Sequence, residues 1–233
     1  MRLFLAFCLS IIILPNLSAQ TVNRMSAHRE SQALIKGKKI VEQADCFYNS
    51  ENLKLTVHAK SPTEYIKTIS SKGELKMYFP SDNKLILKQN SYLATSKEEL
   101  YIYLNNMYDD LGLRSEGFTM SSTRYEGEYM IIDWTPPAAH SAKMKKIEIV
   151  YENMMPIYAG VYNSKDEIYK KTYYSDYHID SNLIIPQRVT DITYKSKTDS
   201  IVRRVIYSNI KINSQADSSL ENLKIPENAK LIK

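Results

Sequence analysis

The sequence predicts a mainly β protein of the α+β class, built on one curved antiparallel sheet with two helices. From residue 53 onward, apolar and polar residues alternate in one segment after another, which is typical of strands with one buried face. Only two segments show helical spacing of apolar residues instead. Because two helices cannot cover both faces of about nine or ten strands, we expect the sheet to curl and the helices to shield its concave face.

The first 20 residues have the parts of a secretory signal peptide in the expected order. Met1 and Arg2 form a short basic region, and residues 3–14 are predominantly apolar. This run is too short to cross a membrane, which takes about 20 apolar residues. We expect cleavage after Ala19 or Gln20, which would leave one exported domain at residues 21–233.

The composition of that domain excludes several classes of protein. The chain has a formal net charge of +5 with lysines and acidic residues interspersed, so we expect no nucleic acid as a partner. Cys46 is the only cysteine after residue 20, so an intramolecular disulfide is impossible. We expect Cys46 to be a small buried hydrophobic residue rather than a nucleophile.

The first helix is predicted at residues 30–46. Its apolar residues recur at helical spacing, namely Ala33, Leu34, Ile40, Val41 and Ala44. Gly37 is a weak point within this segment, because glycine destabilises a helix interior. Polar residues at 49–52 end the predicted helix.

The second helix is predicted at residues 96–112. Ser96 and Glu99 form a capping box, and Gly112 is placed as a C-terminal stop. Between them, apolar residues follow at helical spacing: Leu100, Tyr103, Leu104, Met107, Tyr108 and Leu111. A strand is the alternative, because residues 101–104 favour extended structure. The caps at both ends favour the helix.

Alternating segments predict the strands. Residues 53–60, 74–79 and 84–88 come before the second helix, with a turn at residues 80–83. Beyond that helix we expect strands at residues 118–123, 129–134, 146–151, 157–161, 168–174, 186–194 and 201–208. The last of these continues towards Ile212, and a short closing strand or extended tail lies within residues 223–232.

Motifs for catalysis or phosphate binding are absent from the sequence, which lacks G-x-S-x-G, H-E-x-x-H, C-x-x-C and a glycine-rich loop. Asp176, His178 and Asp180 alternate, so a strand would point all three the same way, and that geometry could hold a divalent metal. We favour the alternative of an exposed strand end with ordinary polar residues. We therefore expect a protein that is not an enzyme and has no metal and no cofactor.

Tyrosine is abundant, with 18 residues against five phenylalanines and one tryptophan. A tyrosine ring covers apolar surface while its hydroxyl stays polar. Two interpretations remain open at this point. The tyrosines are half-buried strand residues, or they line the mouth of a wide cavity.

Three segments resemble the LolA-type outer-membrane lipoprotein carriers and their lipoprotein-sorting relatives. Residues 73–80 run from a glycine through an alternating strand to a proline, and residues 129–136 form a strand that ends in Thr-Pro. The third segment runs from Ile185-Pro186 through Ile212-Asn213 to residues 220–232. The order of helix, strands and capped helix is also similar over most of residues 30–232.

The resemblance implies an open half-barrel, in which a strongly curved antiparallel sheet and covering helices enclose a hydrophobic cavity. Members of this family carry lipoproteins across the periplasm by holding their acyl chains. Lys84 stands where the family has an arginine that helps to latch the lid, and lysine lacks the planar fork of arginine. The segment before the second helix is also shortened, to residues 90–95. These departures indicate a divergent member of the LolA-like superfamily.

We therefore expect a monomeric periplasmic carrier of lipoprotein acyl chains or similar lipids, with inner-membrane donor and outer-membrane acceptor proteins as further partners. Apolar contacts in the cavity are assigned to Leu53, Leu55, Val57, Leu75, Met77, Phe79, Met130, Ile132, Trp134, Ile147 and Ile149. The choice of Ile132 over Ile131 rests on Asp133 preferring solvent.

The second predicted helix is expected to act as a movable lid. Its inward residues are Leu100, Tyr103, Leu104, Met107 and Leu111. The alternative function is a non-catalytic sensor of hydrophobic ligands, or a scaffold that binds a protein partner at the sheet edge.

Overall fold

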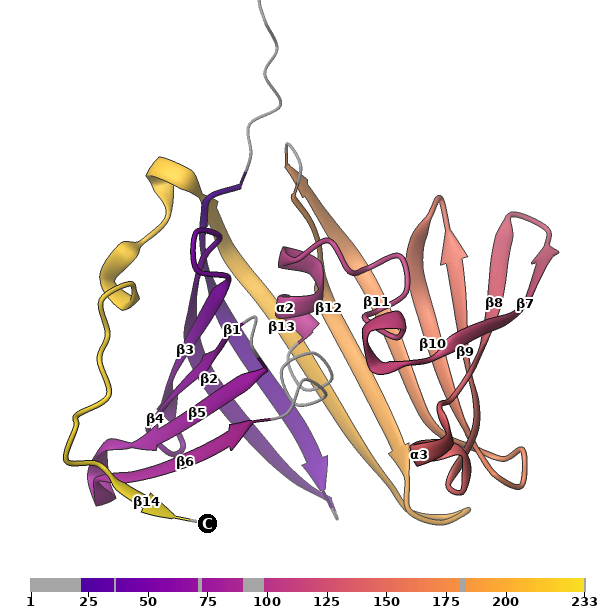
Figure 1. Cartoon of the computed structure of the whole chain (residues 1–233), viewed down its shortest axis with the longest axis horizontal. Coiled ribbons are helices and arrows are strands. Elements are labelled where there is room, and N and C mark those ends of the chain that lie inside the picture. The colour runs from indigo at the N-terminus through magenta and orange to yellow at the C-terminus, as the bar shows by residue number, and fades with distance from the viewer. Residues whose placement is uncertain (1–21, 36, 71–72, 90–98, 181–182, 233) are drawn as a thin grey trace, which may run out of the picture.

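The computed structural model describes residues 22–35, 37–70, 73–89, 99–180 and 183–232. These residues form a single curved sheet of 14 strands (Figure 1). Its strand order is β14-β6-β5-β4-β3-β2-β1-β13-β12-β11-β10-β9-β8-β7. Because β14 and β7 lie at opposite ends of this order, the sheet is not closed. The predicted mainly β architecture with one curved sheet is confirmed.

The sheet consists of two antiparallel meanders. The first contains β1 (Arg24–Ile35), β2 (Lys38–Asn49), β3 (Lys54–Ser61), β4 (Tyr65–Ile69), β5 (Glu74–Phe79) and β6 (Lys84–Gln89). The second contains β7 (Thr119–Glu126), β8 (Tyr129–Thr135), β9 (Met144–Glu152), β10 (Met155–Asn163), β11 (Ile168–Asp180), β12 (Leu183–Tyr194) and β13 (Ser200–Ile212). Antiparallel pairing of β1 with β13 joins the two meanders.

The remaining elements are short. They are η1 (Pro80–Asp82), α2 (Glu99–Leu104), η2 (Arg114–Glu116), α3 (Ala138–Ser141), η3 (Asn213–Gln215), η4 (Ser218–Leu220) and β14 (Lys230–Ile232), which pairs with β6 in parallel. Residues 213–232 run along the outside of the first meander (Figure 1). Within the described residues, no helix has both the length and the apolar character that a membrane span needs.

The helix predicted at residues 30–46 is wrong, because these residues form the hairpin of β1 and β2. Gly37 has a φ of +76° and lies in the turn between the strands. Ala33 lies directly opposite Ile40 in the hairpin. Their spacing along the chain therefore reflects pairing across two strands, and it imitates two turns of a helix.

The helix predicted at residues 96–112 is much shorter in the structure. The helix α2 ends at Leu104, and Ser96 of the proposed capping box lies outside the described residues. The Asn105 side chain donates a hydrogen bond back to the Tyr101 carbonyl at 2.8 Å, and Asn106 adopts a left-handed φ of 54°. Both features end a helix. An asparagine side chain can occupy a backbone group that the helix would otherwise use, and asparagine tolerates the left-handed conformation. Gly112 therefore ends a later turn rather than the helix.

The predicted strands from residue 53 onward are confirmed with shifted ends, but β1, β2 and β4 were not expected as strands. The prediction of nine or ten strands is therefore too low. Pro62 and Gly73 lie on either side of β4, and such residues are typical of a connection between strands. The strand β4 spans only Tyr65–Ile69, and such a short run gives a weak alternation signal.

The hydrophobic core lies on the concave face and draws on both meanders and α2. Its largest fully buried side chains include Trp134, Tyr48, Tyr103, Tyr151, Tyr207 and Met25. Cys46 is 1% exposed, as expected for a small buried hydrophobic residue. The core thus places aromatic side chains from distant strands around α2.

Candidate functional site

An apolar cavity of about 140 Å³ lies between the concave face of the second meander and the segment formed by α2 and the chain that follows it. Ile102, Leu111 and Leu113 line it on one side. The sheet side is formed by Ile147, Ile149, Ala159, Val161, Lys170, Thr172, Tyr174 and Asp191. The cavity therefore has mostly apolar walls with a few polar groups from β11 and β12.

Strand alternation decides which side chains of β8 and β9 face the core. Ile132 and Trp134 lie in the core, whereas Asp133 between them forms an ion pair with Lys146 at 3.0 Å. Lys146 also contacts Glu148 at 3.5 Å. Charged residues thus occupy the opposite face of the sheet, in agreement with the expected orientation of β8.

The structure separates the predicted cavity residues into groups. Ile147 and Ile149 line the cavity. Others belong to the same core without lining the cavity: Leu55, Val57, Leu75, Met77, Met130, Ile132 and Trp134. Phe79 packs against Tyr65 with ring centroids 6.2 Å apart. Leu53 does not face the interior, because it precedes β3 with a φ of 48° and is 38% exposed.

Residues 99–118, here named the cover segment, connect the two meanders across the concave side. The helix α2 packs against β12. Three of its side chains, Leu100, Tyr103 and Leu104, are at most 9% exposed. Met107 and Leu111 are partly buried against the same core, and Leu111 also lines the cavity. All five predicted lid residues therefore point into the protein.

Tyrosine hydroxyl groups connect the cover segment to three strands. Tyr48 of β2 donates a hydrogen bond to the Asn105 side chain at 3.2 Å, and Tyr151 of β9 donates to the Asp109 carbonyl at 2.6 Å. The hydroxyls of Tyr103 and Tyr177 are 3.2 Å apart. Burial raises the pKa of Tyr48 to about 12, and it also raises the pKa of Tyr151 and Tyr177 above the ordinary value. These tyrosines explain part of the unusual composition.

A cation–π contact adds another attachment. The Arg114 guanidinium lies 5.1 Å from the centroid of the Trp134 ring, and it pairs with Asp109 at 2.9 Å. Lys84, at the position of the expected family latch, instead pairs with Asp82 of the adjacent turn at 2.9 Å. No local pattern predicts the contact of Arg114, because Trp134 is 20 residues away on another element.

One end of the cavity carries a buried carboxylate. Asp191 accepts a hydrogen bond from the Thr172 hydroxyl at 2.7 Å, and it pairs with Lys170 at 3.2 Å and Arg203 at 2.8 Å. Burial opposes ionisation of this carboxyl, but the two cations and the hydroxyl outweigh it and hold the pKa of Asp191 below its ordinary value. Asp191 is therefore an anion at neutral pH.

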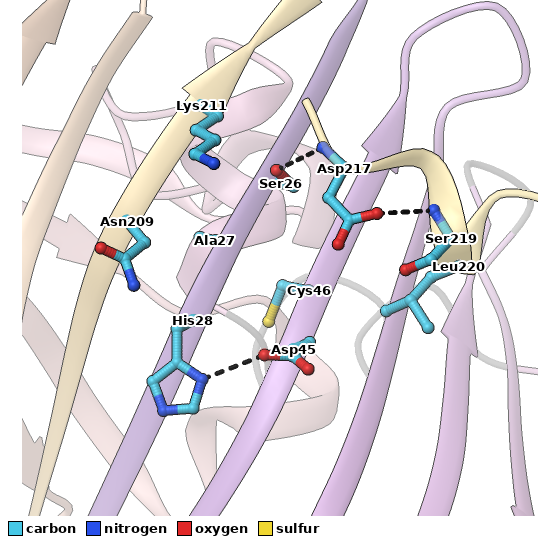
Figure 2. A pocket seen from close by; sticks show the side chains of 10 residues that line it. All are labelled: Ser26, Ala27, His28, Asp45, Cys46, Asn209, Lys211, Asp217, Ser219 and Leu220. Atoms are coloured by element: carbon cyan, nitrogen blue, oxygen red, sulfur yellow. Dashed lines mark hydrogen bonds and ion pairs between the residues drawn. The ribbon is translucent and has the colours of Figure 1, made fainter. Parts of the chain in front are cut away.

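A second pocket, of about 240 Å³, is polar and lies where the C-terminal segment crosses β1 and β2. Figure 2 shows His28 and Asp45 on these neighbouring strands, with Asp217 beside them. His28 Nδ1 and Asp45 Oδ1 are 3.0 Å apart, and the Asp217 N–H donates to the Ser26 hydroxyl at 2.9 Å. The first contact joins β1 to β2, whereas the second fastens the C-terminal segment to the sheet. The polar walls of this pocket do not suit a lipid.

The metal geometry considered at Asp176, His178 and Asp180 is interrupted. Asp176 has a φ of 56° and lies outside the regular pairing of β11 with β12. It forms an ion pair with Arg188 at 3.0 Å. Among the residues that the structure describes, no group of three or more His, Cys, Asp or Glu side chains could hold a metal ion.

Comparisons with known proteins identify the fold. No protein-family model and no curated protein sequence matches the chain. An outer membrane lipoprotein-sorting protein domain from Vibrio parahaemolyticus is similar, with a TM-score of 0.58 at 10% identity, over 86% of this chain and 89% of that chain. A LolA superfamily protein from Nitrosomonas europaea has a TM-score of 0.55 at 11% identity, over 85% of this chain and 89% of that chain.

A DUF1329 family protein from Desulfovibrio piger is similar to the same extent, with a TM-score of 0.56 at 10% identity, over 87% of this chain and 90% of that chain. At such low identity the likeness concerns the fold, and it extends over most of the chain. It agrees with the resemblance found in the sequence. The chain is therefore a divergent protein with the LolA-like fold.

Proposed function

We propose that this protein is a carrier that binds the acyl chains of lipoproteins, or similar lipids, beneath the cover segment. The supporting observation is the apolar cavity between the cover segment and the sheet. Solved structures with the same fold include a LolA superfamily protein and a lipoprotein-sorting domain. The proposal gives the cavity residues apolar contacts and no catalytic role.

The size of the cavity implies that the cover segment moves when a ligand binds. A cavity of about 150 Å³ holds a molecule of the size of benzene. At about 140 Å³, the present cavity is therefore too small for a long acyl chain. Outward movement of Leu111 and Ile102 would extend the cavity towards core residues of the sheet. In the proposal, Ile132, Trp134 and the apolar residues of β3 and β5 then contact the chain.

The energetics of acyl binding also favour a movable cover. Burial of one methylene group contributes about 0.8 kcal/mol. Complete burial of three long chains would exceed the non-covalent affinity limit of roughly 20 kcal/mol, and release would become too slow for transport. A carrier therefore buries its ligand in part, or releases it by moving the cover segment away from the sheet.

The location and partners belong to the same proposal. Residues 1–20, proposed as a cleaved signal, lie outside the described part of the chain. Export would place the domain at residues 21–233 in the periplasm, where it would act as a monomer. An inner-membrane donor and an outer-membrane acceptor would exchange the lipid with it.

Native mass spectrometry of the exported protein tests this proposal. The protein is isolated from producing cells without detergent, and its mass is compared with the mass of the cleaved chain. We expect an added mass that tandem fragmentation identifies as an acyl lipid. A population that is entirely ligand-free, and that takes up no lipid when mixed with vesicles, would contradict the carrier function.

A second candidate function rests on the edge of the sheet. Among the described strands, β7 pairs only with β8, so its other side is open to an added strand. Met120 and Tyr125 of β7 are 55% and 72% exposed. Such an edge suits a scaffold that binds an extended segment of a partner protein. Ligand-free protein that copurifies with a stable partner would favour the scaffold over the carrier.

A further inference from the structure

Exposed lysines gather at one end of the sheet. The hairpins β1–β2, β12–β13 and β10–β11 turn at this end and β9 starts there, so the four connections follow one another along the lower edge in Figure 1. Their exposed lysines are Lys38, Lys39, Lys143, Lys145, Lys165, Lys195 and Lys197. The exposed acidic residues beside them are fewer, namely Asp166, Glu167 and Asp199. We name this edge the lysine end.

The opposite end of the same strands has the reverse composition. Its turns lie at residues 50–53, 126–129, 152–155 and 180–183, and these stretches contain no lysine or arginine. Their charged residues are all acidic, namely Glu51, Glu126, Glu128, Glu152 and Asp180. Charge is therefore polarised along the strands, and such a distribution turns the lysine end towards an anionic surface.

The protein itself neutralises little of this charge. Lys145 pairs with Asp166 at 2.7 Å. Among the residues that the structure describes, no ion pair within 4 Å holds the exposed lysines of the β1–β2 and β12–β13 hairpins. An anionic partner can therefore approach these lysines without displacing an internal carboxylate.

A cleft of about 500 Å³ lies between the β10–β11 and β12–β13 hairpins at the lysine end. Two tyrosines and two lysines line it together with Ile168, namely Tyr169, Tyr194, Lys195 and Lys197. Glu167 also lines the cleft, and its carboxylate accepts a hydrogen bond from the Asn163 side chain at 3.1 Å. Tyrosine rings favour the headgroup layer of a membrane, and lysines beside them are attracted to anionic lipids.

Two apolar side chains project beside the turn of the β1–β2 hairpin. Leu34 and Ile40 are 47% and 45% exposed. Leu34 lies directly opposite Lys39, and Ile40 lies directly opposite Ala33, so the two apolar side chains are on opposite faces of the hairpin. A protein surface would cover one face, whereas the headgroup layer of a bilayer closes around both. The ammonium groups of Lys38 and Lys39 can stay among the headgroups meanwhile.

We propose that the lysine end is a docking surface for a bilayer that contains anionic phospholipids. In this arrangement the β1–β2 hairpin inserts Leu34 and Ile40 at the level of the headgroups. Lys195 and Lys197 contact lipid phosphates at the mouth of the cleft. The inference adds a docking surface to the proposed carrier, and it does not depend on what the cavity holds.

The variant Lys195→Gln with Lys197→Gln tests the charged part of this surface. Lys54→Gln with Lys224→Gln is the matched control, because it removes the same charge from a separate pocket beside β4 and β5. Leu34→Ser with Ile40→Ser tests the apolar part. Ala159→Phe fills the cavity and separates docking from uptake of a lipid. Thermal unfolding verifies that each variant is folded.

Cosedimentation with vesicles measures the affinity of the full exported domain. The vesicles are pure phosphatidylcholine, or an equal mixture of phosphatidylcholine and phosphatidylglycerol. We expect the wild-type protein to bind the mixed vesicles, to ignore the neutral ones and to dissociate at high salt. Because each lysine near an anionic surface contributes about fivefold in affinity, the Lys195 and Lys197 double variant should bind about thirtyfold more weakly. The control should lose much less, since more distant charges are screened by salt.

The apolar variant should also bind the mixed vesicles severalfold more weakly, and Ala159→Phe should bind them like the wild-type protein. Absence of binding to the mixed vesicles, or equal binding to both kinds, overturns the docking inference and leaves the carrier function standing. Binding that depends on the lysines but not on Leu34 and Ile40 also overturns it, and favours an acidic protein as the partner. Loss of vesicle binding in folded Ala159→Phe would show that lipid uptake, rather than docking, retains the protein.

Discussion

The Arg114 guanidinium lies over the Trp134 ring, with 5.1 Å between the guanidinium carbon and the ring centroid. Arg114 belongs to the cover segment and Trp134 to β8, so this contact joins the cover to the sheet. Trp134 is fully buried and is the only tryptophan in the sequence. Its fluorescence therefore reports on the attachment of the cover segment without any label.

Removing the Arg114 side chain should loosen the cover segment. For Arg114→Ala, we expect the free energy of unfolding to fall by about 1 kcal/mol, the usual contribution of such a cation–π contact, and the Trp134 emission to change. Uptake of a fluorescent fatty-acid probe, measured by stopped flow, should become faster. Arg114→Lys is the control that keeps the charge but loses the planar stacking. Unchanged emission and uptake in Arg114→Ala would show that this contact does not hold the cover.

Filling the cavity should prevent ligand binding without unfolding the protein. Ala159 lines the cavity and is 7% exposed, so Ala159→Phe places a ring in the space of about 140 Å³. We expect overpacking to cost about 1–3 kcal/mol of stability and probe binding to disappear. Tyr125→Ala on the exposed edge strand is the control and should bind normally. Full binding by a folded Ala159→Phe protein would place the ligand elsewhere.

The buried Tyr48 hydroxyl predicts a specific alkaline effect on stability. Its pKa is raised from the ordinary value of 10 to about 12, so its contribution is complete below pH 10 and is lost as the pH rises towards 12. Between pH 9 and pH 11, the free energy of unfolding should fall by about 1 kcal/mol more in the wild-type protein than in Tyr48→Phe. Urea titrations at both pH values measure this difference. Equal losses in the two proteins would contradict the assignment.

Leu53 and Leu55 form a matched pair of leucines that tests where β3 begins. Leu55 is fully buried, so Leu55→Ala should lower the free energy of unfolding by about 2–5 kcal/mol. Leu53 is 38% exposed, and Leu53→Ala should change the free energy of unfolding by less than about 0.5 kcal/mol. Chemical denaturation compares the two. A large loss for Leu53→Ala would mean that its side chain packs inside after all.

Apart from β4, the sheet from residue 53 onward could be predicted, because its strands alternate cleanly and are separated by turn residues. The orientation of β8 followed from Asp133, whose charge keeps it on the face opposite to the core. The sequence pattern predicts a helix where the structure has the hairpin of β1 and β2, because residues paired across two strands can have helical spacing along the chain. Periodicity alone does not distinguish whether apolar residues lie along one element or across two.

The candidate site was less predictable, because its residues meet only in the folded chain. Asp191, Lys170 and Arg203 come from three strands, and none of them belongs to a local motif. Arg114 and the tyrosine contacts of the cover segment are equally non-local. For the tyrosine contacts, the excess of tyrosine is the one signal in the sequence, and it leaves two interpretations open.

The central claim is that an acyl chain enters the space between the sheet and the cover segment only when the cover segment moves. Tyr48 of β2 and Asn105 of the cover segment are in contact, with 3.2 Å between the Tyr48 hydroxyl and the Asn105 amide oxygen. In a Cys46→Ser background, cysteines at positions 48 and 105 can be joined with a short bis-maleimide, and each single-cysteine protein treated with the reagent serves as a control.

Uptake of a fluorescent long-chain fatty acid by the cross-linked protein is the most direct measurement. We expect the cross-link to abolish uptake, while both single-cysteine controls bind the probe like the Cys46→Ser protein. Uptake by the fully cross-linked protein at the same rate and affinity as the controls would contradict the account.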